Sequence, residues 1–155
     1  MAAPSRILVP VDLKDGSRSV IEYALQLARP FGATVDIIHA WEPPQYVAPD
    51  LLVASPGWDA QALETMARDS AGKELATLLQ SLEGSAPVAL SHRVVIGEAA
   101  NIVLEEAQRG KYDLIVMGTH GRKGLTRMLL GSVAQKVVSH ATCPVLTLHV
   151  TPEQA

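Results

Sequence analysis

An α/β fold built on a five-stranded parallel sheet is predicted by two regularities of the sequence. Five short apolar runs, several of them rich in β-branched residues, alternate with longer stretches whose apolar residues recur at helical spacing. Glycine or proline stands at most of the places where these segments meet. Because helical crossovers between parallel strands are right-handed, we expect helices on both faces of the sheet.

The length and composition indicate a single globular domain spanning residues 1–155. The chain is 48% hydrophobic and 19% charged, which is typical of a folded protein with a sizeable core. Its net charge of −3 argues against general nucleic-acid binding. The lone Cys143 allows no internal disulfide. No secretory signal or membrane-spanning run is visible, so we expect a cytoplasmic protein that does not bind membranes.

The first strand is predicted at Ile7–Val11. Pro10 would interrupt a central hydrogen-bond ladder, so it is expected at the strand's carboxyl end. Asp12 follows directly, and ligands of parallel α/β sheets bind beyond the carboxyl ends of strands. Asp12 is therefore a candidate ligand-binding residue, and its alternative role is that of a helix cap or salt-bridge partner.

A helix with Asp15 as its N-cap is expected next, and Pro30 and Gly32 end it. The second strand is predicted at Thr34–Ala40. No second residue of the metal-binding types lies at ligand spacing from His39. We therefore predict a satisfied or partly buried histidine there rather than a metal ligand.

The stretch Trp41–Asp59 interrupts this alternation, because it holds four prolines and three aromatic residues. Long loops of this kind are usually functional or disordered. The sequence leaves two readings open. The stretch is either a mobile flap over a ligand site, or a surface loop whose aromatic side chains cover the core.

The remaining elements follow the same alternation. They are an amphipathic helix over Leu63–Leu82, a strand at Leu90–Ile96, a helix that ends at Gly110, a strand at Asp113–Met117, a helix that ends near His140 and a strand at Pro144–Val150.

The loop between the fourth strand and the last helix is rich in glycine and basic. From Leu114 to Pro152 the chain carries four basic residues and no acidic one, although the whole protein is acidic. Glycines let backbone N–H groups approach an anion, and a following helix adds its N-terminus. Ser132 can cap that helix or donate its hydroxyl to a phosphate oxygen. The alternative is that the glycines only form turns and the charges are solvated.

The spacing of these glycines carries a family resemblance. Gly118-x-x-Gly121, nine further residues and then Gly131-Ser132 match the G-2x-G-9x-G-S/T nucleotide-binding pattern of the universal stress protein family. The opening Ile7-Leu8-Val9-Pro10-Val11-Asp12, and the segments from Asp113 to Arg122 and from Ser132 to Leu146, resemble the same family. This resemblance implies a flavodoxin-like (adenine nucleotide alpha hydrolase-like) domain with strand order 3-2-1-4-5, which often binds ATP and usually dimerises.

The resemblance also implies where ATP would bind. In strand order 3-2-1-4-5 the chain reverses direction between strands one and four, and ligands bind in the crevice at such a switch point. Asp12 would lie by the adenosine, and the small Ala40 would leave room for the base. The expected contacts are Pro10, Val11, Asp12, Ala40, Gly97, Met117, Gly118, Thr119, His120, Gly121, Arg122, Gly131, Ser132 and Val133.

Three of these positions keep alternatives. Gly97 either lies near the ribose or phosphates or only forms a tight turn that needs no side chain. His120 is expected to order the loop or contact phosphate rather than act as a general base, because no carboxylate nearby in the sequence orients it. Asp12 could hold Mg²⁺ through phosphate oxygens. No catalytic residue and no metal site belonging to the protein itself is predicted.

The fifth strand would lie at an edge of the sheet, and its apolar residues would be exposed there. Pairing with the same strand of a second copy removes that edge, so a homodimer through Val145–Val150 is predicted. The classical phosphate loop, the dinucleotide fingerprint and the nucleophile elbow are absent from the sequence. The leading hypothesis is an ATP-binding stress-response module whose nucleotide state controls contact with an unknown protein partner. The alternatives are a slow ATPase or phosphotransferase on the same site, or a nucleotide-free dimeric adaptor.

Overall fold

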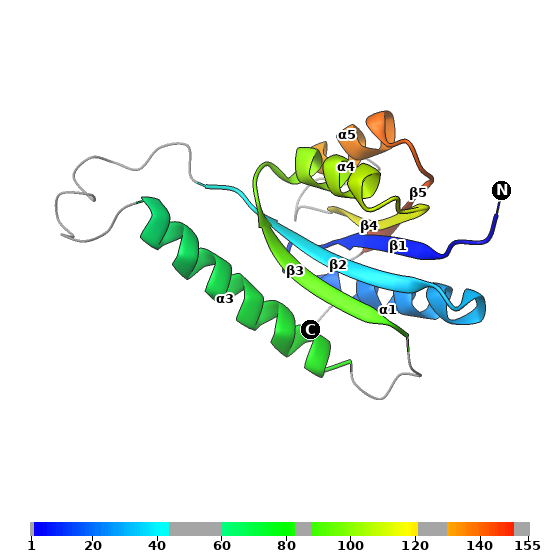
Figure 1. Ribbon diagram of the computed structural model, residues 1–155, viewed down its shortest axis with the longest axis horizontal. Coiled ribbons are helices and arrows are strands. Elements are labelled where there is room, and N and C mark those ends of the chain that lie inside the picture. Colours follow the sequence, from blue (N-terminus) through cyan, green and yellow to red (C-terminus); the bar gives the residue numbers. More distant parts are fainter. Residues whose placement is uncertain (1, 44–59, 83–87, 121–129, 151–155) are drawn as a thin grey trace.

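Five parallel strands form one sheet in the order β3-β2-β1-β4-β5, as predicted (Figure 1). The computed structural model describes residues 2–43, 60–82, 88–120 and 130–150. The strands are β1 (Arg6–Pro10), β2 (Thr34–Trp41), β3 (Leu90–Ile96), β4 (Leu114–His120) and β5 (Val145–Val150). Pro10 ends β1, which is the position that its missing N–H requires.

Helices cover both faces of the sheet, as expected (Figure 1). They are α1 (Ser17–Ala28), followed by the short 3-10 helix η1 (Arg29–Phe31), then α3 (Ala60–Gln80), α4 (Ala99–Arg109) and α5 (Ser132–His140). Within the described part of the chain, no helix is both long and apolar enough to span a membrane. Residues 44–59 of the predicted flap or surface loop lie outside the described residues.

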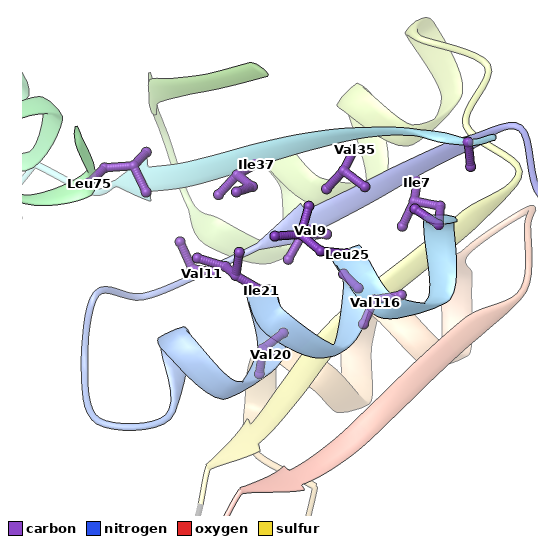
Figure 2. Packing of buried hydrophobic residues seen from close by; sticks show 13 residues of the cluster. Ile7, Val9, Val11, Val20, Ile21, Leu25, Val35, Ile37, Leu75 and Val116 are labelled. Carbon is purple, nitrogen blue, oxygen red and sulfur yellow. The ribbon is translucent and has the colours of Figure 1, made fainter. Parts of the chain in front are cut away.

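Alternation along the strands separates two hydrophobic cores. Ile7 and Val9 of β1 face α1 and α3, together with Val35 and Ile37 of β2 (Figure 2). The intervening Leu8 faces the opposite way and packs in the core beneath α4 and α5. Successive side chains of a strand point to opposite faces, so both faces of β1 are buried. This burial explains why the strand sequence is continuously apolar rather than alternating.

The predicted N-cap of α1 is wrong. Gly16, not Asp15, is the N-cap residue, and its backbone adopts a left-handed conformation with φ of +97°. No side chain caps this helix through a hydrogen bond at that position. Instead, Oδ1 of Asp12 accepts hydrogen bonds from the Lys14 N–H at 3.0 Å and from the Ser17 hydroxyl at 3.1 Å. The acid that stabilises this turn therefore lies three residues earlier than expected.

The helix α3 is only partly attached to the sheet. Of its 21 residues, only Ala71 and Leu75 are buried, and both lie beyond its first eleven residues. Met66, which belongs to the predicted apolar face, is 54% exposed. At its other end, Arg18 of α1 donates hydrogen bonds to the hydroxyl and the carbonyl of Ser81. The C-terminal half of α3 thus fixes the helix, and its first half extends beyond β3 (Figure 1).

A polar network lies at the amino ends of the strands, on the α4 side of the sheet. Asp36 accepts hydrogen bonds from Tyr112 at 2.5 Å, from Arg6 at 3.1 Å and from Ser91. Burial alone would raise the pKa of Asp36, but the hydrogen bonds from Ser91, Tyr112 and Arg6 outweigh it and hold that pKa below its usual value. The Arg6 guanidinium also lies 4.5 Å from the centre of the Tyr112 ring. Three strands and the segment before β4 are therefore tied together through one carboxylate.

Replacing the Tyr112 hydroxyl tests the weight of this network. We expect Tyr112→Phe to lower the free energy of unfolding by about 1–2 kcal/mol, because Asp36 loses a donor while the ring stays in place. Tyr23→Phe is the matched control, since Tyr23 is 42% exposed on α1 and should change stability by less than about 0.5 kcal/mol. Urea unfolding monitored by circular dichroism measures both. Equal effects of the two variants would contradict this assignment.

Candidate functional site

The carboxyl ends of β1 and β4 lie side by side at the centre of the sheet. Ile7 and Leu8 of β1 pair with Leu114 and Ile115 of β4, and both strands then continue toward the same edge of the sheet. The chain that continues from β1 leads to β2 on one side, whereas β4 and β5 lie on the other. This is the switch point at which ligands of open α/β sheets bind. The Pro10–Asp12 and Met117–Thr119 segments therefore lie at the carboxyl-end side of neighbouring strands, and their joint contact with a nucleotide stays a prediction.

The side chain of Asp12 folds back on its own loop. Its Oδ1 holds the Lys14 N–H and the Ser17 hydroxyl, and Ser17 is only 6% exposed. Neither alternative left open by the sequence, a helix cap or a salt bridge, describes these two contacts, which stabilise the loop before α1. Leu13, the next residue, has a φ of +62°, which is unusual for a residue with a branched side chain. Such strained backbone persists only where its surroundings hold it, and it is typical of ligand-binding loops.

Met117 and Thr119 place their side chains inside the protein. Met117 is 4% exposed and belongs to the core beneath α4 and α5. The Thr119 hydroxyl donates to the Leu148 carbonyl at 3.2 Å and lies 3.4 Å from Nδ1 of His149. Over Met117–Thr119, β4 can therefore offer a ligand mainly its backbone. His120 ends β4, and Gly121 and Arg122 lie outside the described residues.

Packing restricts Gly118 of the candidate site and, more strongly, Gly16 in the loop after β1. A methyl group on Gly118 would lie 3.1 Å from Cγ2 of Val20 in α1. On Gly16 it would lie only 2.5 Å from Cγ1 of Val150, the last residue of β5. Sequence reasoning missed Val150, whose side chain packs against the loop after β1 and lies near Gly118 of β4. No sequence signal marks it, because an apolar residue at a strand end is ordinary.

Gly97 forms the tight turn that was one of its two predicted roles. Its φ is +148°, and its N–H donates to the Trp41 carbonyl at 2.9 Å. A methyl group there would lie 2.7 Å from Cδ1 of Ile102. The turn alone therefore explains the glycine. Ala40, which precedes Trp41 in β2, is partly buried against the core beneath α4 and α5.

The N-terminus of α5 differs from the expected cap. Gly131 is the N-cap residue, no side chain caps the helix, and Ser132 is its first, exposed residue. The Gly131 carbonyl accepts the first helical hydrogen bond, from Gln135 at 2.9 Å. The prediction that Ser132 caps α5 is therefore wrong, because a residue within the first turn cannot occupy the cap position. Its exposed hydroxyl, followed by the partly buried Val133, leaves the other predicted role open.

Two further residues shape this end of the sheet. Nδ1 of the partly buried His39 lies 2.9 Å from the Val11 carbonyl, so His39 is satisfied as predicted. Glu98, which the sequence analysis passed over, is the N-cap of α4 and accepts from the N–H groups of Ala100 and Asn101. Lys136 of α5 lies 3.3 Å from Glu98 and joins the two helices. Among the described residues, no cluster of three or more His, Cys, Asp or Glu side chains could hold a metal ion.

We compared the sequence and the structure of the chain with those of known proteins. The sequence model of the family described as "Universal stress protein family" matches residues 4–149. The chain belongs to the universal stress protein family. A universal stress protein of Methanocaldococcus jannaschii is 34% identical over 143 residues, which cover 92% of this chain and 81% of that protein. The resemblance drawn from the glycine spacing is thereby confirmed.

Solved structures of universal stress proteins share the fold. UspA from Lactobacillus plantarum has a TM-score of 0.78 at 24% identity and covers 96% of this chain and 100% of its own. A universal stress protein in complex with cAMP has a TM-score of 0.71 at 22% identity, with 97% and 100% covered. One from Archaeoglobus fulgidus in complex with dAMP has a TM-score of 0.59 at 19% identity, with 94% and 98% covered.

Alanine at Gly16 tests how tightly the loop after β1 packs on β5. We expect Gly16→Ala to lower the free energy of unfolding by about 2 kcal/mol or more, because left-handed strain adds to a collision with Val150. Gly32→Ala is the matched control, since Gly32 also has a positive φ but nothing within 4 Å of the added methyl group. Its expected cost is about 1 kcal/mol.

Thermal and urea unfolding of both variants check this expectation. Val150→Ala in the Gly16→Ala background should recover part of the loss, because it removes the methyl groups that collide. An equal cost at Gly16 and Gly32, with no recovery, would show that β5 does not constrain the loop.

Proposed function

We propose that this universal stress protein is an ATP-binding regulatory module, with the nucleotide bound in the crevice between β1 and β4. The observation that carries the proposal is that β1 and β4 are neighbours in the sheet, so that Pro10–Asp12 and Gly118–Thr119 belong to the carboxyl ends of adjacent strands. These segments are far apart in the sequence, and each was predicted separately to contact a nucleotide. The relatives solved with cAMP and dAMP support an adenine nucleotide as the ligand class.

The residues divide between the two ends of the nucleotide. Asp12 and Ala40 lie at the ends of β1 and β2, where the adenosine would bind. Backbone N–H groups from Gly118 onward, together with the first turn of α5, would hold the phosphates. The four basic residues between Leu114 and Pro152 favour a ligand with several phosphates over one with a single phosphate. For this reason we propose ATP rather than another adenine nucleotide.

Any Mg²⁺ would enter with the nucleotide. Mg²⁺ often binds through one or two carboxylates and the phosphates of a substrate, so a protein cluster is not required. The Asp12 carboxylate is the one acidic side chain among the expected contacts. Because its Oδ1 already accepts two hydrogen bonds, the side chain is oriented before any ligand arrives.

We infer that two copies pair through β5. This strand is an edge of the sheet, and apolar residues make up four of its six positions. The Ile115 N–H donates to the Pro144 carbonyl at 3.0 Å, so the alternating ladder turns the N–H of Thr147 away from β4. An outward row of backbone donors and acceptors is what a second copy would pair with.

A negative charge at the start of α5 tests the phosphate site. Ser132→Asp should weaken ATP binding about tenfold or more, since the carboxylate would repel the phosphates. The same charge favours the helix N-terminus, so stability should stay level or rise by a few tenths of a kcal/mol. Opposite signs for affinity and stability separate a binding role from a folding defect.

The matched control is Ser139→Asp, which places the same charge at the exposed C-terminal end of α5. It should leave ATP affinity unchanged and slightly lower stability. Isothermal titration calorimetry with ATP and parallel thermal unfolding provide both readouts. The proposal fails if wild type does not bind ATP, or if both variants bind it as tightly as wild type.

Proline at Thr147 tests the dimer. We expect Thr147→Pro to shift the protein to monomer, because it removes an outward N–H while leaving the β4 ladder its donors. Thr147→Val keeps the N–H and should remain dimeric. Sedimentation velocity over a concentration series, with circular dichroism to verify folding, distinguishes them. A dimer that persists in folded Thr147→Pro would place the interface elsewhere.

A further inference from the structure

Val11 directly follows β1, and β2 binds both its backbone N–H and its backbone carbonyl. The Val11 N–H donates to the Ile38 carbonyl at 2.9 Å. The Val11 carbonyl lies 2.9 Å from Nδ1 of His39. The first contact continues the strand ladder, whereas the second comes from a side chain. This carbonyl belongs to the peptide that leads into Asp12, so its orientation decides where the candidate nucleotide loop begins.

We propose that His39 is a positioning residue for nucleotide binding, acting through the Val11 carbonyl on the Asp12 loop. The proposal rests on the proposed function, because it concerns the same site. His39 has the register of Val35 and Ile37, so its ring lies on the α1 and α3 side of the sheet and needs no contact with the ligand. Its effect on the ligand would pass through the Val11 carbonyl.

The hydrogen bond fixes the tautomer of the imidazole. A carbonyl oxygen only accepts hydrogen bonds, so Nδ1 of His39 must carry the proton. In the neutral ring, Nε2 is then the unprotonated nitrogen. This assignment is a chemical consequence of the contact, and it can be measured without any ligand.

The contacts of Asp12 itself show why the hydrogen bond between His39 and the Val11 carbonyl matters. Oδ1 of Asp12 binds the Lys14 N–H and the Ser17 hydroxyl, which anchors the loop to the start of α1. Between these anchors lies Leu13, with its left-handed φ of +62°. A strained residue persists where the structure holds it from both sides. His39 of β2 restrains the loop through the Val11 carbonyl, and Ser17 of α1 restrains it through Asp12.

Loss of the imidazole should therefore affect binding more than folding. The five residues of β1 are paired with β2 in register from Arg6 to Pro10, before His39 becomes involved. The strand would remain in the sheet, while the Val11–Asp12 peptide would gain freedom. A ligand would then have to order the loop as it binds, which lowers its affinity.

Two amide substitutions separate the position of the donor from the mere presence of a polar group. His39→Asn keeps an N–H donor near the place of Nδ1, and His39→Gln places its amide near that of Nε2. We expect the H39N variant to bind ATP within about threefold of wild type. The H39Q variant should bind about five- to tenfold more weakly, the range expected for one lost hydrogen bond. Isothermal titration calorimetry provides these dissociation constants.

Stability measurements exclude a merely structural role. Thermal unfolding of both variants should show similar losses, so that the difference in affinity does not follow stability. Tyr112→Phe is the destabilised control, because Tyr112 bonds Asp36 at the amino end of the strands, and it should bind ATP as wild type does. Equal affinities of H39N and H39Q, whether both normal or both weakened, would overturn the positioning role.

The tautomer provides an independent readout in the free protein. Imidazole ¹⁵N chemical shifts of neutral His39 should show a protonated Nδ1 and an unprotonated Nε2. The opposite tautomer would overturn the proposal, whatever the affinities are. If wild type fails to bind ATP while Nδ1 proves protonated, the proposed function fails, whereas the hydrogen bond that orients the loop is retained.

Discussion

The burial of β1 at the centre of the sheet is the constraint from which the site follows. β1 pairs with β2 on one side and with β4 on the other, and Ile7, Leu8 and Val9 are all fully buried. A strand held this way cannot shift its register without exposing one of two cores. Its carboxyl end is therefore fixed relative to β4, and the loops that leave both strands must share one crevice. The site is a consequence of strand order before any ligand is considered.

Gly16 and Gly118 also have close side-chain neighbours, so packing limits which residues these two positions can hold. Gly16 and Gly118 both lie near Val150, and Gly118 also lies against Val20. Helix α1, strand β4 and the end of β5 thus meet where side chains would not fit. Since β5 is an edge strand, the surface proposed for pairing and the loops proposed for nucleotide are built from adjoining residues. The Thr119 hydroxyl on the Leu148 carbonyl adds a polar contact at the same junction.

The fold was accessible from sequence because its signals are local. Apolar runs with punctuating glycine and proline predicted four strands to within one residue at each end, and β3 with the observed bounds, whereas β4 continues three residues beyond its predicted end. The strand order was different, since it came from the family resemblance and not from periodicity. Caps were predicted poorly, because a glycine occupies the N-cap position at both Gly16 and Gly131: Asp15 was assigned in error, and the capping role that was one of two left open for Ser132 is excluded. A cap depends on φ and ψ at one residue, which composition does not reveal.

Contacts between distant residues explain what the sequence could not provide for the site. Ser17, His39 and Val150 each look ordinary in their own segments, and only the folded chain brings them to the loop after β1. The same holds for Asp36, Ser91 and Tyr112, which would be taken singly for surface residues. Spacing could reveal the glycine pattern because its members are close in the chain. No spacing rule connects residues that three different elements contribute.

The two ends of the parallel sheet are built by different means, and this separates stability from function. At the amino ends, the carboxylates of Asp36 and Asp113 are surrounded by donors. Burial raises the pKa of Asp113, but hydrogen bonds from Ser5 and Arg6 outweigh it and lower that pKa below its usual value. Carboxylates with lowered pKa values stabilise the fold above about pH 4, and this contribution is lost as the pH falls through their folded-state values.

The carboxyl ends instead hold glycines with close neighbours and a left-handed leucine, Leu13. An ion pair between Lys136 and Glu98 lies beside the carboxyl ends as well, whereas the carboxylate of Asp36 ties three strands together at the amino ends. Strain at Leu13 is held locally by the hydrogen bonds of Val11 and Asp12, whereas Arg6 anchors the opposite end of β1 to Asp36 and Asp113. The proposed nucleotide site thus lies at the opposite end of the sheet from the Asp36 network, so a change in that network can alter stability without contacting the site.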